Sequence, residues 1–259
     1  GADRYRSAVW LVPADPAGGE ARPLTTGTES DAQARWSPDG GRIAFVRTTR
    51  LDAGVRAEVC VLPVGGPGEA VVVATSPQAI AGLAWSPDGS RLAWSARVLD
   101  EGADRPDRDR EPRRVDTLLT RLDDVGWTVD RRSQVFVGPA DGTGAPRQLT
   151  SGPYEHGAPA WSPDGRTLAL VAGRHDGWDL DGVQDLWLLD VDDPGADGPE
   201  LRRLTAGDRT WSMPAWSPDG TRIAAVGDDQ RTGWRNPRPY VVDVATGAVV
   251  DVAPGVDRS

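Results

Sequence analysis

Residues 161–170 read Trp-Ser-Pro-Asp-Gly-Arg-Thr-Leu-Ala-Leu, and three more copies of this stretch begin at residues 36, 85 and 216. Each copy has Trp-Ser-Pro-Asp-Gly, two mostly polar residues, Ile or Leu, Ala and an apolar residue. Ser, Pro and Gly suit the first, second and fourth corners of a type I turn, and this Gly can adopt a positive φ. Each copy therefore predicts a β-hairpin, and four such hairpins indicate a repeat architecture.

Two more kinds of strand recur between these hairpins. One is an apolar run, found at residues 9–12, 59–62, 135–137, 186–189 and 240–242. The other is a short strand ending in Leu-Thr at 23–25, 148–150 and 203–205, with 71–73 and 249–251 in the equivalent places. Several apolar runs are continuous rather than alternating, which indicates sheets covered on both faces. Four-stranded sheets repeated along the chain predict an all-β fold, a β-propeller of four-stranded blades.

We expect a single partial β-propeller domain over residues 1–259, with about four and a half blades. If each blade begins with the strand that leads into Trp, the blades are 33–74, 82–150, 158–205 and 213–251, and 5–26 is a half blade. An incomplete blade leaves open strand edges, which invite aggregation. We therefore expect closure to need further sequence, and the chain, which starts Gly-Ala-Asp, to be part of a longer protein.

The 76-residue spacing between the second and third motifs holds a charged loop insertion at residues 98–115. Its acids and arginines are Asp100, Glu101, Asp104, Asp107, Asp109, Glu111, Arg105, Arg108, Arg110, Arg113 and Arg114. With Gly and Pro among them, these residues predict a solvated loop, followed by an extra strand within 115–127. Two roles stay open for this loop: a spacer on the propeller rim, or a flap over its mouth.

Composition limits the partners of the chain. The net charge of −10 would repel nucleic acid. Cys60 is the single cysteine, so no internal disulfide is possible, which fits a reducing compartment and a cytoplasmic location. No run of about 18 apolar residues occurs, and we expect no membrane span.

The residues that usually carry catalysis do not form a recognisable motif. No Gly-x-Ser-x-Gly nucleophile elbow is present, and Ser212 is not flanked by the glycines of such a motif. His156 is expected in a loop that could face the channel mouth, and His175 follows the next strand. The acids Asp176, Asp179, Asp181 and Asp185 lack the spacing of a calcium loop, so we interpret them as a hydrated turn. The sequence therefore predicts no catalytic residue, no metal site and no cofactor.

The fourfold Trp-Ser-Pro-Asp-Gly motif resembles the propeller repeats of TolB and of the prolyl oligopeptidase family. Residues 121–127 (Arg-Leu-Asp-Asp-Val-Gly-Trp) and 130–137 (Asp-Arg-Arg-Ser-Gln-Val-Phe-Val), followed by Arg-Gln-Leu-Thr at 147–150, are similar to a segment of acylaminoacyl-peptidase and dipeptidyl-peptidase members. Asp124 stands where those members have Gly. The resemblance covers nearly the whole chain, but only the propeller part of such an enzyme.

In that family the propeller caps a C-terminal α/β-hydrolase domain with a Ser-Asp-His triad, and admits short peptides but not folded proteins. The resemblance thus implies a hydrolase domain of the same polypeptide and short peptides as partners. It also implies substrate-binding roles for Arg121, Asp123, Trp127 and Arg131, although these residues could equally stiffen the rim. An acidic cavity wall would attract a peptide's α-amino group. Two alternatives remain: a TolB-like protein-binding propeller of the cell envelope, and a stand-alone scaffold.

Overall fold

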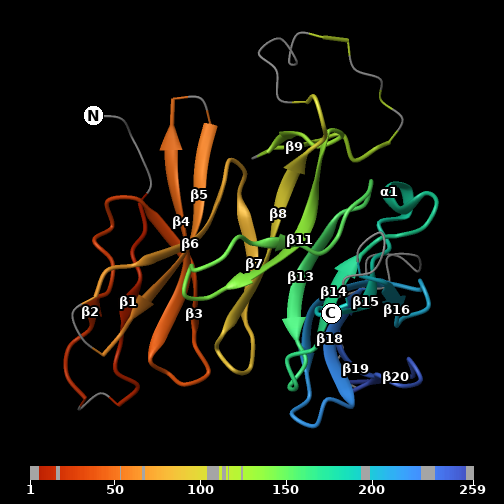
Figure 1. Cartoon of the computed structure of the whole chain (residues 1–259). Helices are drawn as coiled ribbons and strands as arrows, with labels where there is room; N and C mark the ends of the chain where they lie inside the picture. Colours follow the sequence, from red (N-terminus) through yellow and green to blue (C-terminus); the bar gives the residue numbers. More distant parts are fainter. Residues whose placement is uncertain are drawn as a thin grey trace. The chain divides into compact units, whose positions relative to one another are not determined.

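The computed structural model describes residues 6–15, 18–52, 54–65, 68–103, 111–112, 115, 117–123, 125–193, 199–228 and 237–254. This described part is almost entirely β-structure, with one short helix, α1 (Trp178–Asp181) (Figure 1). It holds four four-stranded sheets and two small two-stranded sheets. The chain divides into two compact units, residues 1–96 with 137–147 and residues 97–136 with 148–259. The fold is a partial β-propeller of four-stranded blades, as the sequence predicts.

Each four-stranded sheet follows the chain as a meander. The first sheet comprises β3 (Ser30–Trp36), β4 (Arg42–Leu51), β5 (Gly54–Pro63) and β6 (Val71–Ser76). The second comprises β7 (Ile80–Trp85), β8 (Arg91–Leu99), β11 (Arg131–Pro139) and β12 (Arg147–Gln148). The third comprises β13 (His156–Trp161), β14 (Thr167–Ala172), β15 (Asp185–Asp190) and β16 (Leu201–Arg203). The fourth comprises β17 (Thr210–Trp216), β18 (Arg222–Asp228), β19 (Arg238–Asp243) and β20 (Val249–Asp251).

The two small sheets are antiparallel pairs. β1 (Trp10–Leu11) pairs with β2 (Arg22–Pro23), and β9 (Arg121–Leu122) pairs with β10 (Gly126–Trp127). The extra strand expected within 115–127 is therefore a short hairpin. Residues 104–110, 113 and 114 of the charged insertion, and Asp124, lie outside the described residues.

The four Trp-Ser-Pro-Asp-Gly stretches form the predicted turns. The amide of Gly40 donates to the carbonyl oxygen of Ser37 at 2.9 Å, and the other three turns repeat this bond. The four glycines have φ between 69° and 72°. The sequence did not predict the side-chain bonds: each Ser hydroxyl donates to the Asp two residues later, at 2.5 to 2.6 Å. The same hydroxyl accepts the amide five residues on, at 2.9 to 3.0 Å. These bonds lock each hairpin.

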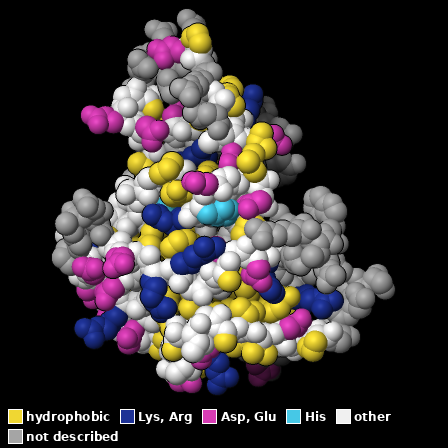
Figure 2. Space-filling view, turned by 90° about the vertical axis from the view of Figure 1, so that its right-hand side faces the viewer, with side chains coloured by type: hydrophobic (Ala, Val, Ile, Leu, Met, Phe, Trp, Pro, Cys, Tyr) yellow, Lys and Arg dark blue, Asp and Glu magenta, His cyan; other side chains and the backbone are white. Residues whose placement is uncertain are grey.

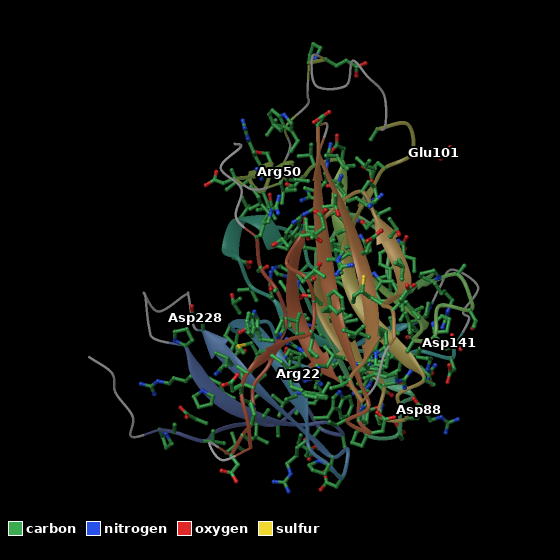
Figure 3. All side chains as sticks on the ribbon, turned by 90° about the vertical axis from the view of Figure 1, so that its left-hand side faces the viewer. Arg22, Arg50, Asp88, Glu101, Asp141 and Asp228 are labelled. Atoms are coloured by element: carbon green, nitrogen blue, oxygen red, sulfur yellow. The ribbon has the colours of Figure 1, made fainter. Side chains whose placement is uncertain are left out.

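Hairpin ends of the first unit adjoin one another. Asp88, in the second turn, and Asp141, in the β11–β12 turn, lie at one end of the strands, and Arg50 lies at the other (Figure 3). The amide of Ala140 donates to the carbonyl oxygen of Ser90 at 2.8 Å, which joins the two turns.

The first strand of every four-stranded sheet contains a β-bulge. The register of β3, β7, β13 and β17 shifts just before the motif Trp. At each shift one residue adopts a left-handed backbone: Gln33 (φ 56°), Gly82 (φ 65°), Ala158 (φ 49°) and Met213 (φ 54°). The Gln33 amide then bridges two strands, because its Nε2 donates to the Ile80 carbonyl at 2.9 Å and its Oε1 accepts the Gly82 amide at 3.1 Å.

The Leu-Thr pairs lie just beyond the outermost strands instead of ending them. The Thr hydroxyl oxygen accepts a backbone amide in each case: Thr25 from Val9 at 3.0 Å, Thr150 from Val135 at 2.9 Å, and Thr205 from Leu186 at 3.0 Å. Since all three threonines are buried, this bond replaces a ladder bond that the short strand cannot make.

The motif Trp joins neighbouring sheets within each unit. Trp85 Nε1 donates to the Arg35 carbonyl, and Trp216 Nε1 donates to the Ala160 carbonyl, both at 3.0 Å. The accepting residue in each case directly precedes the motif Trp of the sheet before. Trp36 differs, because it is 51% exposed.

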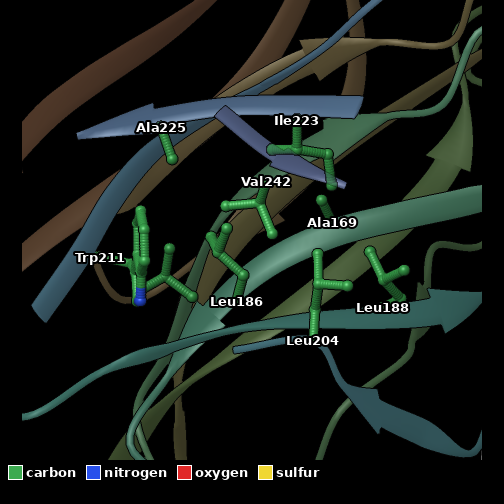
Figure 4. Close-up of a cluster of buried hydrophobic side chains, with 9 residues drawn as sticks. Ala169, Leu186, Leu188, Leu204, Trp211, Ile223, Ala225 and Val242 are labelled. Carbon is green, nitrogen blue, oxygen red and sulfur yellow. The ribbon is translucent and has the colours of Figure 1, made fainter. Parts of the chain in front are cut away.

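Buried apolar clusters lie between sheets. In the second unit, side chains of the third and fourth sheets form one cluster, which includes the fully buried Trp211 (Figure 4). In the first unit, Val9 packs against Ile43, Phe45 and Cys60 of the first sheet. Burial raises the pKa of the Cys60 thiol to about 11, so this thiol stays protonated at neutral pH. The described residues contain no helix that is long and apolar enough to cross a bilayer.

Candidate binding site

Three of the four predicted substrate-binding residues lie together on the β9–β10 hairpin. Arg121 and Trp127 are register partners, and Asp123 lies in the turn between them. Arg121 and Asp123 are exposed, whereas Trp127 is partly buried. The buried Thr128 fixes the base of this hairpin, since its amide donates to the Thr120 carbonyl at 2.8 Å. The hairpin therefore presents one cation, one anion and one indole from a fixed base.

The fourth predicted residue, Arg131, begins β11. Its Nε donates to Oδ1 of the neighbouring Asp130 at 2.9 Å, and its carbonyl oxygen accepts a bond from Arg97 at 3.0 Å. Asp130 is 2% exposed, so the carboxylate that pairs with Arg131 is buried in the protein.

A buried charged cluster beside Arg131 was not predicted. Glu155 accepts from Arg97 NH1 at 2.9 Å, from Arg132 NH1 at 3.4 Å and from the Ser133 amide at 3.1 Å. The side chains of Arg97, Arg132 and Glu155 are at most 14% exposed. Two guanidinium groups share one carboxylate, so the cluster carries a net positive charge.

Arg132 also connects this cluster to the segment before the hairpin. It donates to the Leu119 carbonyl at 3.3 Å and to Thr117 Oγ1 at 3.4 Å. Its guanidinium stacks 5.2 Å from the centre of the Trp178 ring, at the start of α1. Arg132 is thus fixed from several directions.

A cleft of about 500 Å³ lies against Arg132, within the size range of small-ligand sites. Its walls are Val98, Asp100, Thr117, Val129, Arg132, Gln134, Gln148, Ser151, Gly152 and Pro153. None of the four predicted residues lines it. The lining pairs one cation and one anion with amide and hydroxyl groups, and so differs from the acidic wall expected from the net charge.

His156 is the first residue of β13 and is 1% exposed, so it does not lie in a loop as predicted. Its Nε2 lies 2.7 Å from Arg174 NH1. Because a guanidinium only donates, Nε2 must accept, and the ring is neutral with its proton on Nδ1. Burial and then the charge of Arg174 lower the pKa of His156 to about 4, against a smaller opposing effect of backbone groups of Ser133 and Tyr154.

A second cleft of about 320 Å³ lies against Arg174. Its walls are Gln148, Leu149, Thr150, Ser151, Arg174, Pro199 and Leu201, and it shares Gln148 and Ser151 with the first cleft. Figure 2 shows a face of the molecule on which acidic and basic side chains are mixed around a histidine. The candidate site therefore consists of two adjoining clefts in the second unit, each with one arginine in its wall.

The other candidates have structural contacts. His175 Nε2 lies 3.1 Å from both carboxylate oxygens of Asp181. Asp185 accepts from Arg203 at 2.6 Å and from the Thr205 hydroxyl at 2.6 Å. Ser212 lies in β17, one residue before the bulge residue Met213. No group of three or more His, Cys, Asp or Glu in the described part is arranged to hold a metal.

Sequence reasoning missed Arg97, Arg132, Glu155 and Arg174 as a group. They come from β8, β11, the loop before β13 and the segment after β14. Arg-Arg at 131–132 and Tyr-Glu-His at 154–156 were visible motifs. No spacing along the chain, however, shows that these side chains meet.

Comparison with known proteins supports the fold assignment. No family model matches the chain. The uncharacterized peptidase YuxL of Bacillus subtilis is 28% identical over 194 residues, which is 72% of this chain and 28% of that protein. The chain thus spans little more than a quarter of this curated relative.

Solved structures give the same picture. An acylaminoacyl peptidase of Pyrococcus horikoshii matches with a TM-score of 0.63 and 18% identity, over 93% of this chain and 34% of that one. TolB of Acinetobacter baumannii matches with a TM-score of 0.60 and 17% identity, over 92% of this chain and 47% of that one. At these identities the likeness concerns the fold, and the resemblance to peptidase and TolB propellers inferred from the motifs is confirmed.

Proposed function

We propose that this chain is the non-catalytic propeller of a serine peptidase of the prolyl oligopeptidase family, which gates the active site and helps to bind short peptides. The observation that carries this proposal is the cleft of about 500 Å³ against Arg132. Three of its lining residues, Arg132, Gln134 and Gln148, belong to the stretches that resemble acylaminoacyl peptidases, in a chain similar to a peptidase over 72% of its length.

The chemistry of this cleft suits a peptide. Arg132 brings guanidinium N–H groups to its wall, Ser151 brings a hydroxyl, and Val98, Val129 and Pro153 add apolar surface. Mixed polar and apolar lining of this kind fits a peptide backbone with small side chains. We also propose that Arg121, Asp123, Trp127 and Arg131, at the hairpin and the start of β11, contact the substrate as it enters.

The chemical step belongs to another part of the same polypeptide in this proposal. The chain has no Gly-x-Ser-x-Gly elbow, so a C-terminal α/β-hydrolase domain would supply the nucleophile and its triad. The propeller would select substrates by size. A cytoplasmic location completes the proposal and rests on the single, buried Cys60.

Hydrolysis of aminoacyl-nitroanilides tests this division of labour. The isolated chain should show no turnover, whereas the full-length parent protein should show turnover that a serine-directed inhibitor blocks. Serine-dependent turnover by the isolated chain, or an inactive parent, would contradict the proposal.

The role of the hairpin is tested in the full-length parent. Trp127→Ala should raise KM for a tetrapeptide substrate several-fold and leave kcat for a single-residue nitroanilide unchanged. Arg166→Gln, at an exposed turn position, is the matched control and should change neither constant. An unchanged KM for Trp127→Ala would assign the hairpin a stiffening role only.

A TolB-like binding propeller of the cell envelope is the second candidate, favoured by the match to TolB over 92% of the chain. It predicts that the parent protein carries a secretion signal and fractionates with the envelope. Recovery of the parent in the cytoplasmic fraction would exclude it.

A further inference from the structure

Arg174 differs from the other partly buried arginines of the second unit. Arg97 and Arg132 pair with Glu155, Arg131 with Asp130, Arg209 with Asp208, and Arg238 with Asp251. In the described part of the chain, no carboxylate lies within ion-pair distance of Arg174. A partly buried cation without a counter-charge loses part of its hydration with no ion pair in return, so this position favours an anionic ligand.

The position of Arg174 is nevertheless well defined. Its NH1 donates to Nε2 of the neutral His156 at 2.7 Å. Its guanidinium stacks 5.1 Å from the Tyr154 ring centre and 5.6 Å from the Trp187 ring centre. These neighbours are uncharged acceptors or aromatic faces, so they orient the guanidinium without neutralising it. The result is a preorganised fork with unused N–H donors.

Among the described residues that line the cleft of about 320 Å³ beside Arg174, none is acidic. Arg174 is the one charged residue of this described lining, and Ser151 is an exposed serine beside it. Leu149, Pro199 and Leu201 make the rest of the wall partly apolar. A single planar guanidinium matches a carboxylate, whereas a phosphate dianion usually requires more cations or a set of backbone amides. The apolar wall suits a ligand with a carbon chain.

We propose that this cleft binds an organic carboxylate, with Arg174 as the bidentate partner and the Ser151 hydroxyl as an additional donor. Two sources share this chemistry: the C-terminus of a peptide and a free small organic acid. The site stands on its own geometry and does not require a peptidase parent.

Isothermal titration calorimetry on the full chain tests this site with four probes: N-acetyl-Ala-Ala, its C-terminal amide, propionate and inorganic phosphate. Both carboxylates should bind, and the neutral amide should bind at least tenfold more weakly, because it cannot form the charge-assisted bidentate pair with Arg174. Tighter binding of the peptide acid names a peptide C-terminus as the source, and equal or tighter binding of propionate names a small acid.

Variants locate the site. Arg174→Gln should weaken carboxylate binding at least tenfold, whereas Arg166→Gln removes the same charge at the other end of β14 and should leave it unchanged. Should Arg174→Gln fail to fold, Ser151→Phe, at an exposed position, fills the cleft and should abolish binding. The proposal would be overturned if neither carboxylate bound, if the amide bound equally well, or if phosphate bound more tightly than the carboxylates. It would also be overturned if folded Arg174→Gln or Ser151→Phe bound carboxylates as tightly as wild type.

Discussion

A histidine buried beside an arginine has one workable protonation state. His156 accepts from Arg174 through Nε2, and Nδ1, which then holds the proton, makes no hydrogen bond in the structure. Leaving a buried N–H unpaired costs about 1–3 kcal/mol. The neutral ring is tolerated because the alternative, two adjacent buried cations, costs more. His156 is therefore a positioning residue for Arg174.

Stability should depend on pH through His156. Its pKa is about 4 in the folded chain, against the ordinary histidine value of 6.5 that the unfolded chain retains, so between these values the unfolded state binds the extra proton. The free energy of unfolding is then complete above about pH 6.5 and falls as the pH drops towards 4, by roughly 3 kcal/mol. His156→Gln keeps an acceptor for Arg174 and should flatten this dependence. Urea unfolding at pH 7.5, 5.5 and 4.5 measures it.

Two charged residues of the described part lie next to His156. Arg174 faces it, and Glu155, the preceding residue, is already bonded to Arg97 and Arg132. Arg35→Gln, at an exposed position, serves as the control and should retain the wild-type pH dependence between pH 6.5 and 4. Parallel curves for wild type and His156→Gln between pH 6.5 and 4 would contradict the assignment.

At the scale of elements, the repeat motif forms a turn and a connection between sheets at once. The Ser-Asp bonds close each hairpin, and the Trp that precedes them donates to the sheet before. The Trp side chain thus links the end of its own strand to the first strand of the preceding sheet.

Trp216→Phe should lower the free energy of unfolding by about 1 kcal/mol, because it removes one hydrogen bond and leaves the Ala160 carbonyl without its partner. Trp36→Phe is the matched control: the same change at the same motif position, on a 51% exposed side chain, should cost less than about 0.5 kcal/mol. Chemical denaturation measures both variants. Equal losses would show that ring packing, and not the indole N–H, carries the contribution.

The amino-acid sequence was most informative about the secondary-structure elements. The fourfold motif predicted the hairpins, the four-stranded sheets and the propeller class, because turn residues act locally. The Leu-Thr pairs were noticed but placed inside strands, since the sequence does not show that Thr150 bonds across to Val135. The cluster of Arg97, Arg132 and Glu155 could not be predicted either, because two strands and the loop before β13 must come together before its members meet.

At the scale of the whole molecule, the four turn aspartates should contribute to the loss of stability in acid. Serine and backbone donors lower the pKa of Asp39 and Asp164, and lower those of Asp88 and Asp219 to about 2. A lowered carboxylate pKa stabilises the fold above pH 3.8, and this contribution is lost as the pH falls towards 2.

Replacing all four turn aspartates by Asn should therefore reduce the drop in Tm between pH 5 and pH 3. Asn keeps an oxygen acceptor for the Ser hydroxyl but does not titrate. Asp52→Asn, at an exposed turn, is the control and should behave as wild type. Thermal melts followed by circular dichroism measure the effect, and an unchanged drop in the quadruple variant would assign the acid limit to other groups.

The bulges in the first strands have a consequence for how this fold can vary. Four different residue types adopt the same left-handed backbone conformation: Gln33, Gly82, Ala158 and Met213, the last of which is 75% exposed. A non-glycine residue there costs roughly 1–2 kcal/mol, so the surrounding ladder imposes the shape. Side-chain identity and backbone shape are thus uncoupled at these four places. At the exposed Met213, a lineage or a designer can therefore change the side chain while leaving the backbone unchanged, whereas the Gln33 amide also joins two strands.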